Sequence, residues 1–248
     1  MAKLKQEMIY GIRTVIEAIK EEKAVDKVLI RQGLKGELFQ ELFQLVREKD
    51  IAFQHVPDQK LKALDTRNNQ GVVAFVSPIE YQDIEEIMNL KLAEGKKPVF
   101  LILDRITDVR NFGGIARSAE CAGVDAIIIP HKHSAKICPD SIKTSAGALY
   151  NIPVCKVVNL RKVVKNLKFN GFSIVAATEK ADKVYTEADF SESVAIIMGS
   201  EDKGIREEIL EIVTDKIKIP IVGKIESLNV STATALMIYE VLRQRSLK

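Results

Sequence analysis

The first 76 residues alternate between helix-like and strand-like spacing of their apolar positions. Residues 12–22 and 37–49 carry apolar side chains at the i, i+3, i+4 spacing of an amphipathic helix. The apolar face of the second of these helices consists of Leu38, Leu42, Leu45 and Val46. Short apolar runs bounded by polar residues or glycine are typical of buried strands. They occur at 26–31, 51–56 and 70–76. The pattern predicts a small α/β domain over residues 1–76.

The next segment, 77–97, has a different character. It is first acidic and then basic, and it has prolines close to both ends. We expect a linker that carries a short helix.

From Pro98 onward, strand and helix patterns alternate again. The run 99–104 is continuously apolar and ends in an acidic residue, as a buried parallel strand would. Further strands are expected at 124–130, 154–158, 172–178, 194–200 and 216–220. Helices are expected from near Asn111 and at 160–168, 206–213 and 232–245. The alternation predicts a second α/β domain over 98–248, a mostly parallel sheet with helices on both faces.

In a parallel sheet, ligands bind at the carboxyl ends of the strands. The loops that follow Leu103, Thr178, Met198 and Pro220 are therefore the first candidates for a functional site.

Composition restricts the class of protein. The chain has 248 residues, of which 46% are hydrophobic and 29% charged, which suits two folded domains and not a disordered chain. No apolar stretch reaches the roughly 20 residues of a membrane span, and the charged first residues do not resemble a signal peptide. We therefore expect a cytoplasmic protein with no membrane partner. Three cysteines without a C-x-x-C pair, Cys121, Cys138 and Cys155, support neither a disulfide framework nor a zinc site, and we expect them to be small hydrophobic residues.

The net charge of the chain does not show whether the protein binds nucleic acid. A formal net charge of +3 is compatible with nucleic-acid binding but is not strongly basic. Aromatic residues make up 6% and tryptophan is absent, so the composition gives no sign of a platform for stacking bases.

The loop after Leu103 leads into a helix. The Asn111 side chain can cap this helix, and Gly113 and Gly114 allow a ligand or another backbone segment to approach closely. Arg117 lies opposite the apolar stripe, so spacing alone favours a solvated surface charge. The loop is neither a G-x-G-x-x-G fingerprint nor a Walker phosphate loop, which gives no support to nicotinamide or nucleoside triphosphate binding.

The other two loops each allow two interpretations. In 196–205 an apolar strand runs into Gly199, an acidic pair and Gly204, which is either a plain strand-to-helix turn or part of a site. In 218–236, Ser227, Asn229 and Ser231 are all able to cap the last helix, but a cap needs only one of them. A loop rich in hydroxyls and amides at a strand end also suits a polar ligand.

Taken together, the three loops resemble in order and spacing the three signature motifs of the SpoU (TrmH) branch of the SPOUT methyltransferases. The matching residues are Asn111, Gly113, Gly114 and Arg117 in the first motif, Gly199, Glu201 and Gly204 in the second, and Ser227, Leu228, Asn229, Val230 and Ser231 in the third. The resemblance covers residues 98–248, and the leading domain looks like the L30e-like RNA-binding extension of that family.

The resemblance implies properties that spacing alone does not show. It implies a deep trefoil knot, a homodimer with its site near the subunit interface, and S-adenosylmethionine as methyl donor, leaving S-adenosylhomocysteine, without a metal. Main-chain atoms of Thr178, Gly199, Ile219 and Leu228 would hold the adenine of the donor. Ser227 and Asn229 would shape the same pocket.

The implied reaction is methylation of a ribose 2′-hydroxyl of RNA, with Arg117 as the catalytic residue. A guanidinium is ordinarily a permanent cation and is unsuited to act as a base. Binding of the 3′ phosphate or stabilisation of charge on the 2′ oxygen are the alternatives. Asn111 and Glu201 would position the ribose and Arg117, and Ser227 and Asn229 would orient the reacting groups.

The leading domain favours ribosomal RNA as the partner, with a guanosine of 23S rRNA or its precursor as the target. A tRNA 2′-O-methyltransferase and a non-catalytic RNA-binding protein of the ribosome are the alternatives. A dehydrogenase or a Rossmann-type methyltransferase would need a glycine-rich loop after a strand, and this sequence has none of that type.

Overall fold

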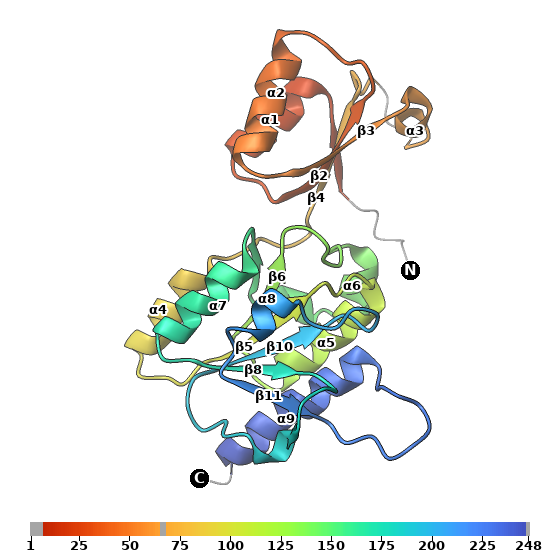
Figure 1. Ribbon diagram of the computed structural model, residues 1–248. Helices are drawn as coiled ribbons and strands as arrows, with labels where there is room; N and C mark the ends of the chain where they lie inside the picture. Colours follow the sequence, from red (N-terminus) through yellow and green to blue (C-terminus); the bar gives the residue numbers. More distant parts are fainter. Residues whose placement is uncertain (1–6, 65–67, 247–248) are drawn as a thin grey trace. The chain divides into compact units, whose positions relative to one another are not determined.

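The computed structural model describes residues 7–64 and 68–246 (Figure 1). The remaining positions, which include the first six residues of the predicted leading domain, lie outside this description. The chain divides into two compact units, one ending at Glu80 and the other comprising most of the chain from Tyr81 onward. Each unit is described by itself.

The first unit is a four-stranded sheet with helices on both faces. The strands lie in the order β1-β4-β2-β3, in which β2 and β3 are parallel and the other pairs antiparallel. Their bounds are β1 Met8–Tyr10, β2 Val25–Arg31, β3 Ala52–Val56 and β4 Val72–Val76. The helices are α1 Ile12–Lys20, α2 Glu37–Glu48 and α3 Asp58–Lys62. All five predicted elements are present, and β1 and α3 were not predicted.

The core of the first unit follows the predicted periodicity. Leu42 and Val46 of α2 are fully buried and pack with α1 and with one face of β2 and β4. Leu38, which shares their helical spacing, is 38% exposed. Leu61 of α3 covers the opposite face of the sheet.

The predicted linker contains helix α4, Ile84–Ala93, which Asp83 caps by accepting from two backbone amides. Ile84, Ile87 and Met88 are buried in the core of the second unit. This part of 77–97 is therefore a packed element, because its apolar residues recur at helical spacing and find a sheet to cover.

The second unit is a seven-stranded sheet in the order β7-β6-β5-β10-β8-β11-β9, and every pair of neighbouring strands is parallel. The strands are β5 Val99–Asp104, β6 Ala126–Pro130, β7 Val154–Val157, β8 Ser173–Ala177, β9 Lys183–Val184, β10 Val194–Gly199 and β11 Asp215–Lys218. Successive strands β5, β6 and β7 extend the sheet one way, and the later strands lie on the other side of β5. The strand order therefore reverses beside β5, which is where α/β sheets bind ligands.

Helices cover both faces of this sheet (Figure 1). They are α5 Val109–Cys121, α6 Pro139–Thr144, α7 Leu160–Phe169, α8 Glu207–Leu210 and α9 Val230–Ser246, with 3-10 turns at Ala148–Tyr150 and Tyr185–Glu187. Phe100 and Ile102 of β5 face the core built with α4, α7 and α8. Because side chains alternate along a strand, Leu101 and Leu103 point to the opposite face, where α5 and α9 pack against each other.

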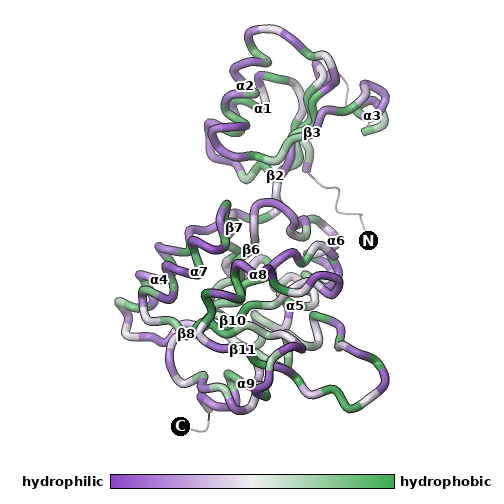
Figure 2. Tube along the Cα trace, in the orientation of Figure 1, coloured by the Kyte–Doolittle hydropathy of each residue, from purple (hydrophilic) through white to green (hydrophobic). Residues whose placement is uncertain are grey.

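The predicted strands and long helices of this unit are confirmed, with three differences. The helix expected at 206–213 has only four residues, and α6 and the two-residue β9 were not predicted. Figure 2 shows hydrophobic residues concentrated in the central strands, with mixed character along the helices.

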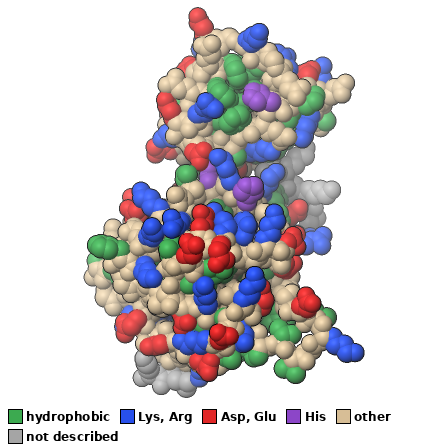
Figure 3. All heavy atoms as spheres, in the orientation of Figure 1, with side chains coloured by type: hydrophobic (Ala, Val, Ile, Leu, Met, Phe, Trp, Pro, Cys, Tyr) green, Lys and Arg blue, Asp and Glu red, His purple; other side chains and the backbone are tan. Residues whose placement is uncertain are grey.

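The surface carries charges of both signs, interspersed over the face in Figure 3, as the small net charge predicts. Within the described part of the chain, no helix is long and apolar enough to span a membrane.

Candidate active site

A pocket lies where the loops after β8, β10 and β11 meet. Because the strands are parallel, their carboxyl ends share one edge of the sheet, and the start of α9 closes the pocket there. The space between its lining residues is about 750 Å³, a figure that includes space open to solvent. Three of the four loops singled out in the sequence therefore converge on one cavity.

Five of the six residues predicted to bind a cofactor line this pocket. They are Thr178, Gly199, Ile219, Ser227 and Leu228. Asn229 is not one of the lining residues. The charged residues of the lining are all acidic: Glu179, Glu201 and Glu226.

Gly199 is required by a close backbone approach. A Cβ atom on Gly199 would lie 2.3 Å from the carbonyl carbon of Gly204. Gly204 has a φ of +61°, and its amide donates to the Ser200 carbonyl oxygen at 2.8 Å. The tight turn proposed for this loop is thus present, and the same turn forms a wall of the pocket.

Side chains from the three motif loops form one polar cluster beside the pocket. Asn229 Nδ2 donates to Asn111 Oδ1 at 2.9 Å and to Glu201 Oε1 at 3.1 Å. Asn111 Nδ2 donates to the same Glu201 oxygen at 3.2 Å. Asn229 Oδ1 accepts from the Ser231 amide at 2.9 Å and from the Ser231 hydroxyl at 2.5 Å. Residues far apart in the sequence are therefore held in one hydrogen-bonded group.

This cluster also caps helix α9. Glu201 Oε1 accepts from the Val230 amide at 3.1 Å, and Asn229 Oδ1 accepts from the next amide, of Ser231. Two of the free amides at the helix start are thereby satisfied, one of them by a carboxylate, which the helix dipole favours. The capping interpretation of the third loop holds for Asn229, whereas Ser227 lines the pocket.

The start of α5 differs from the prediction. Asp108 is the cap, and its carboxylate accepts from the Asn111 amide at 2.7 Å. Asn111 lies in the first turn, so its side chain is free to reach Glu201. The two glycines serve helix packing rather than a ligand, since a Cβ on Gly113 would lie 2.6 Å from Thr144 Cβ, and one on Gly114 would lie 3.3 Å from Ser231 Cβ.

Arg117 is separate from this group. It is exposed on α5, on the side away from the buried residues, and it lies outside the pocket lining. The structure shows no hydrogen bond or ion pair for it within 7–64 and 68–246. Six residues separate it from Asn111, about 9 Å along the helix axis. One subunit alone therefore does not bring Arg117 to the other candidate residues.

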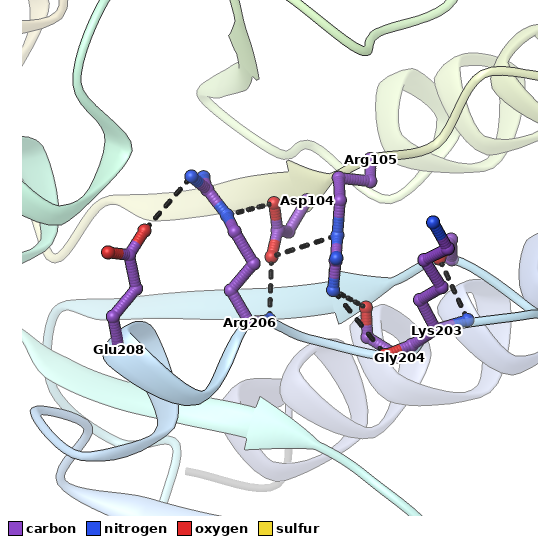
Figure 4. A network of polar contacts seen from close by, with 7 residues as sticks. Asp104, Arg105, Lys203, Gly204, Arg206 and Glu208 are labelled. Carbon is purple, nitrogen blue, oxygen red and sulfur yellow. Dashed lines mark hydrogen bonds and ion pairs between the residues drawn. The ribbon is translucent and has the colours of Figure 1, made fainter.

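A charged network at the end of β5 was not predicted (Figure 4). Asp104 is fully buried and pairs opposite Gly199 in the sheet. Its carboxylate accepts from the Arg206 amide at 2.8 Å and from Arg206 Nε at 2.9 Å. Arg105, from a left-handed backbone position, donates to the Gly204 carbonyl oxygen at 3.1 Å.

This network fixes both ends of the loop that carries Glu201. Arg206 also contacts Glu208 at 3.0 Å, which secures the start of α8. The sequence contained a signal for it, an acidic residue directly after a buried apolar strand, but no spacing rule pointed to Arg206 as its partner.

The cysteines and possible metal ligands are separate from this site. All three cysteines are free; Cys121 is exposed, Cys138 is partly buried and Cys155 is buried. Burial raises the pKa of the Cys155 thiol to about 12. Among the residues placed by the structure, no group of three His, Cys, Asp or Glu side chains is arranged to hold a metal ion.

Comparison with known proteins identifies the family. Residues 98–239 match the SpoU rRNA methylase family, and residues 8–82 match the substrate-binding domain of RNA 2′-O ribose methyltransferases. A TrmH family tRNA/rRNA methyltransferase of Staphylococcus saprophyticus is 36% identical over 239 residues, 96% of each chain.

Two solved structures are also similar. The SpoU methyltransferase AviRb of Streptomyces viridochromogenes, in complex with AdoMet, has a TM-score of 0.62, covers 98% of this chain and 92% of its own, and shares 23% identity. A TrmH/SpoU tRNA modifying enzyme of A. aeolicus has a TM-score of 0.56 and 29% identity, covering 66% of this chain and 84% of its own. The chain thus belongs to the SpoU rRNA methylase family and is an RNA methyltransferase.

Proposed function

We propose that this protein transfers a methyl group from S-adenosylmethionine to a ribose 2′-hydroxyl of RNA, most specifically of a guanosine in 23S rRNA. The observation that carries the proposal is that the second and third motif loops line one pocket, and that Asn111 of the first motif joins them in one polar cluster beside it. The homologous domain of AviRb has been solved with AdoMet bound.

The pocket suits this donor in shape and charge. Ile219, Leu228 and Met237 provide an apolar lining for the adenine, and backbone groups of Thr178 and Gly199 lie at the ends of their strands. Acidic lining residues favour the positively charged sulfonium and amino groups. When bound, the donor supplies an electrophilic methyl group, and the remaining roles fall to side chains of this protein.

A ribose hydroxyl is a weak nucleophile until its proton is removed, so the reaction needs an electrostatic or proton-accepting partner. We assign Arg117 to binding the 3′ phosphate or to stabilising charge on the 2′ oxygen, since no hydrogen bond or ion pair holds its side chain within the described chain and a guanidinium is ordinarily a permanent cation. Glu201 and Asn111 fix the geometry beside the donor, Ser227 contributes to the pocket wall, and Asn229 orients the cluster.

A homodimer would bring Arg117 to a site. Helix α9 exposes Leu236, Tyr239 and Leu242, each about 40% or more accessible, as an apolar surface for a second copy. Helical spacing alone predicts an apolar stripe of Ala233, Leu236, Met237 and Val241 for this contact, but Met237 and Val241 are buried within their own subunit. We therefore place the dimer contact on Leu236, Tyr239 and Leu242, next to α5. We also propose that the trefoil knot of the family lies between β10 and α9.

Ribosomal RNA is the favoured substrate. The matching family is described by rRNA methylation, and a neighbour named as a tRNA enzyme aligns with only 66% of this chain. Transfer RNA is the second candidate, because the curated relatives are named for both RNA classes.

Donor binding tests the proposal against a non-catalytic RNA-binding role. Calorimetry should show binding of S-adenosylmethionine and S-adenosylhomocysteine to the full chain. No binding at millimolar ligand would exclude the enzymatic function and leave only a role in RNA binding.

A further inference from the structure

The first unit carries an exposed aromatic patch that the predicted site does not use. We define the aromatic patch as Phe39, Phe43 and Arg47 of α2 with Phe53 and His55 of β3. The ring centroids of Phe43 and Phe53 are 5.2 Å apart and nearly perpendicular, and those of Phe53 and His55 are 5.8 Å apart. The Arg47 guanidinium lies 5.2 Å from the centre of the Phe43 ring.

The patch is accessible because β3 is the edge strand of its sheet. Phe53 pairs opposite Val28, and His55 opposite Ile30, so both side chains lie on the sheet face that α1 and α2 cover. The helices cover the inner strands, and β3 lies at their margin. Phe53 remains 38% exposed and His55 is also exposed.

The aromatic patch is more than the rim of a core. Phe53 and His55 do not belong to the buried cluster of the first unit, although Phe39 and Phe43 pack against that cluster. Three of the nine phenylalanines of a chain poor in aromatics gather here. Figure 3 shows hydrophobic side chains on this unit with a histidine and a basic side chain beside them.

We propose that the aromatic patch stacks an unpaired nucleobase of the RNA substrate. Proteins recognise unpaired RNA bases by stacking them on Phe, Tyr, Trp or His rings and on Arg guanidinium planes. The patch contains phenylalanine, histidine and arginine side chains. None of its five residues is acidic, and Arg47 supplies a positive charge for a neighbouring phosphate. This inference rests on the proposed function, in which RNA is the substrate.

A protein partner fits this surface less well. Specific protein interfaces bury about 1,200–2,000 Å² in total. Outside the patch, the exposed residues of α2 are polar or charged apart from Leu38; they are Glu37, Gln40, Glu41, Gln44 and Glu48. The apolar area is thus a few rings and one leucine side chain, which is closer to the size of a base than to that of a protein face.

Stacking can be measured on the full-length protein with a single-stranded RNA of about 12 nucleotides that contains 2-aminopurine, whose fluorescence falls when it stacks. The parent protein should quench this probe, and Phe53→Ala should weaken RNA binding at least about fivefold and remove most of the quenching. Phe53→Tyr keeps a ring and should behave like the parent. Arg47→Ala should also weaken RNA binding. Because Arg47 is exposed, this variant tests the patch even if a phenylalanine variant fails to fold.

The matched control is Phe169→Ala, which removes a 90% exposed ring from α7 of the second unit. It should leave quenching and affinity unchanged. Equal quenching by the parent, Phe53→Ala and Arg47→Ala would overturn the inference. It would also be overturned if Phe53→Ala changed the molecular mass in solution but not the RNA affinity, because the patch would then be a contact between copies of the chain. Calorimetry of S-adenosylmethionine on the same variants separates the two proposals, because loss of the patch should leave donor binding intact, whereas failure of the parent to bind donor would refute only the enzymatic function.

Discussion

Glu201 and Asn229 show how single residues join the three motifs. One oxygen of Glu201 accepts from Asn111, Asn229 and the Val230 amide, while Asn229 donates with its nitrogen and accepts with its oxygen. A sequence shows which residues are present in each motif. It could not show that Asp108 rather than Asn111 caps α5, or that Asn229 bonds to Asn111 and Glu201, because both outcomes depend on loops packing from distant parts of the chain.

The two functions of Asn229 can be separated by substitution. Asn229→Ala should destabilise the protein by about 1 kcal/mol through loss of the α9 cap, and should lower methyl transfer. Asn229→Ser keeps an uncharged oxygen that can cap the start of α9 but removes the amide nitrogen that donates to Asn111 and Glu201. Urea unfolding should show the Ser variant near the parent, with transfer still impaired. Parent-like transfer by the Ser variant would show that the hydrogen bonds donated by this nitrogen have no role in the reaction.

Arg117→Ala should abolish methyl transfer while leaving donor affinity within a few-fold of the parent. The side chain is exposed, so the free energy of unfolding should change by no more than about 0.5 kcal/mol. Turnover should fall about a hundredfold or more, because a group that acts on transition-state charge affects chemistry more than ground-state binding.

Arg117→Lys distinguishes the two roles of the guanidinium. Lysine retains the charge but not the planar fork, so substantial residual turnover indicates charge stabilisation and near-complete loss indicates bidentate phosphate binding. If Arg117→Ala had wild-type turnover, Arg117 would be only a solvated surface charge, as its spacing suggests.

At the scale of elements, apolar runs and helical spacing were sufficient for most of the fold. The strand at 99–104 matches β5, and α7 and α9 lie where their periodicity places them. The elements that were missed, β1, α3, α6 and β9, have two to six residues, which is too short for a period to be recognised. The Asp104 and Arg206 pair could not be predicted either, because it depends on β10 lying beside β5, strands that are 90 residues apart along the chain.

The turn between β10 and α8 gives a test of the pocket. Gly199→Ala would place a methyl group against the Gly204 backbone, which cannot move as a side chain could, so the turn must shift. Donor binding by calorimetry should be lost or weakened at least about tenfold, with circular dichroism still showing a folded protein. Gly223→Ala, where no atom lies within 4 Å of the added carbon, is the control and should bind normally. Normal binding by Gly199→Ala would place the donor elsewhere.

At the scale of the whole molecule, the role that we propose for Arg117 calls for two copies of the chain. Arg117 and the pocket lie apart in one subunit, and the exposed apolar residues of α9 lie on a helix that packs against α5. Light scattering should therefore give the mass of a dimer. Leu236→Glu, which places a charge on that exposed surface, should shift the protein toward monomer and reduce transfer.

Mixing two inactive variants tests whether Arg117 acts across the interface. A heterodimer of Arg117→Ala with Gly199→Ala contains one site with an intact pocket and, from the partner, an intact Arg117. An equal, re-equilibrated mixture should recover about a quarter of parent activity, since half of the dimers are mixed and each has one working site. No recovery would indicate that Arg117 serves the pocket of its own subunit.

A methyl-transfer assay on RNA tests the proposed 2′-O-methylation of ribosomal RNA. The purified protein should be incubated with isotopically labelled S-adenosylmethionine and rRNA from cells that lack the gene, and the labelled nucleosides separated after complete digestion. We predict a single labelled product, 2′-O-methylguanosine, from the large-subunit RNA. A label on a base, or no label on RNA by a protein that binds the donor, would contradict it.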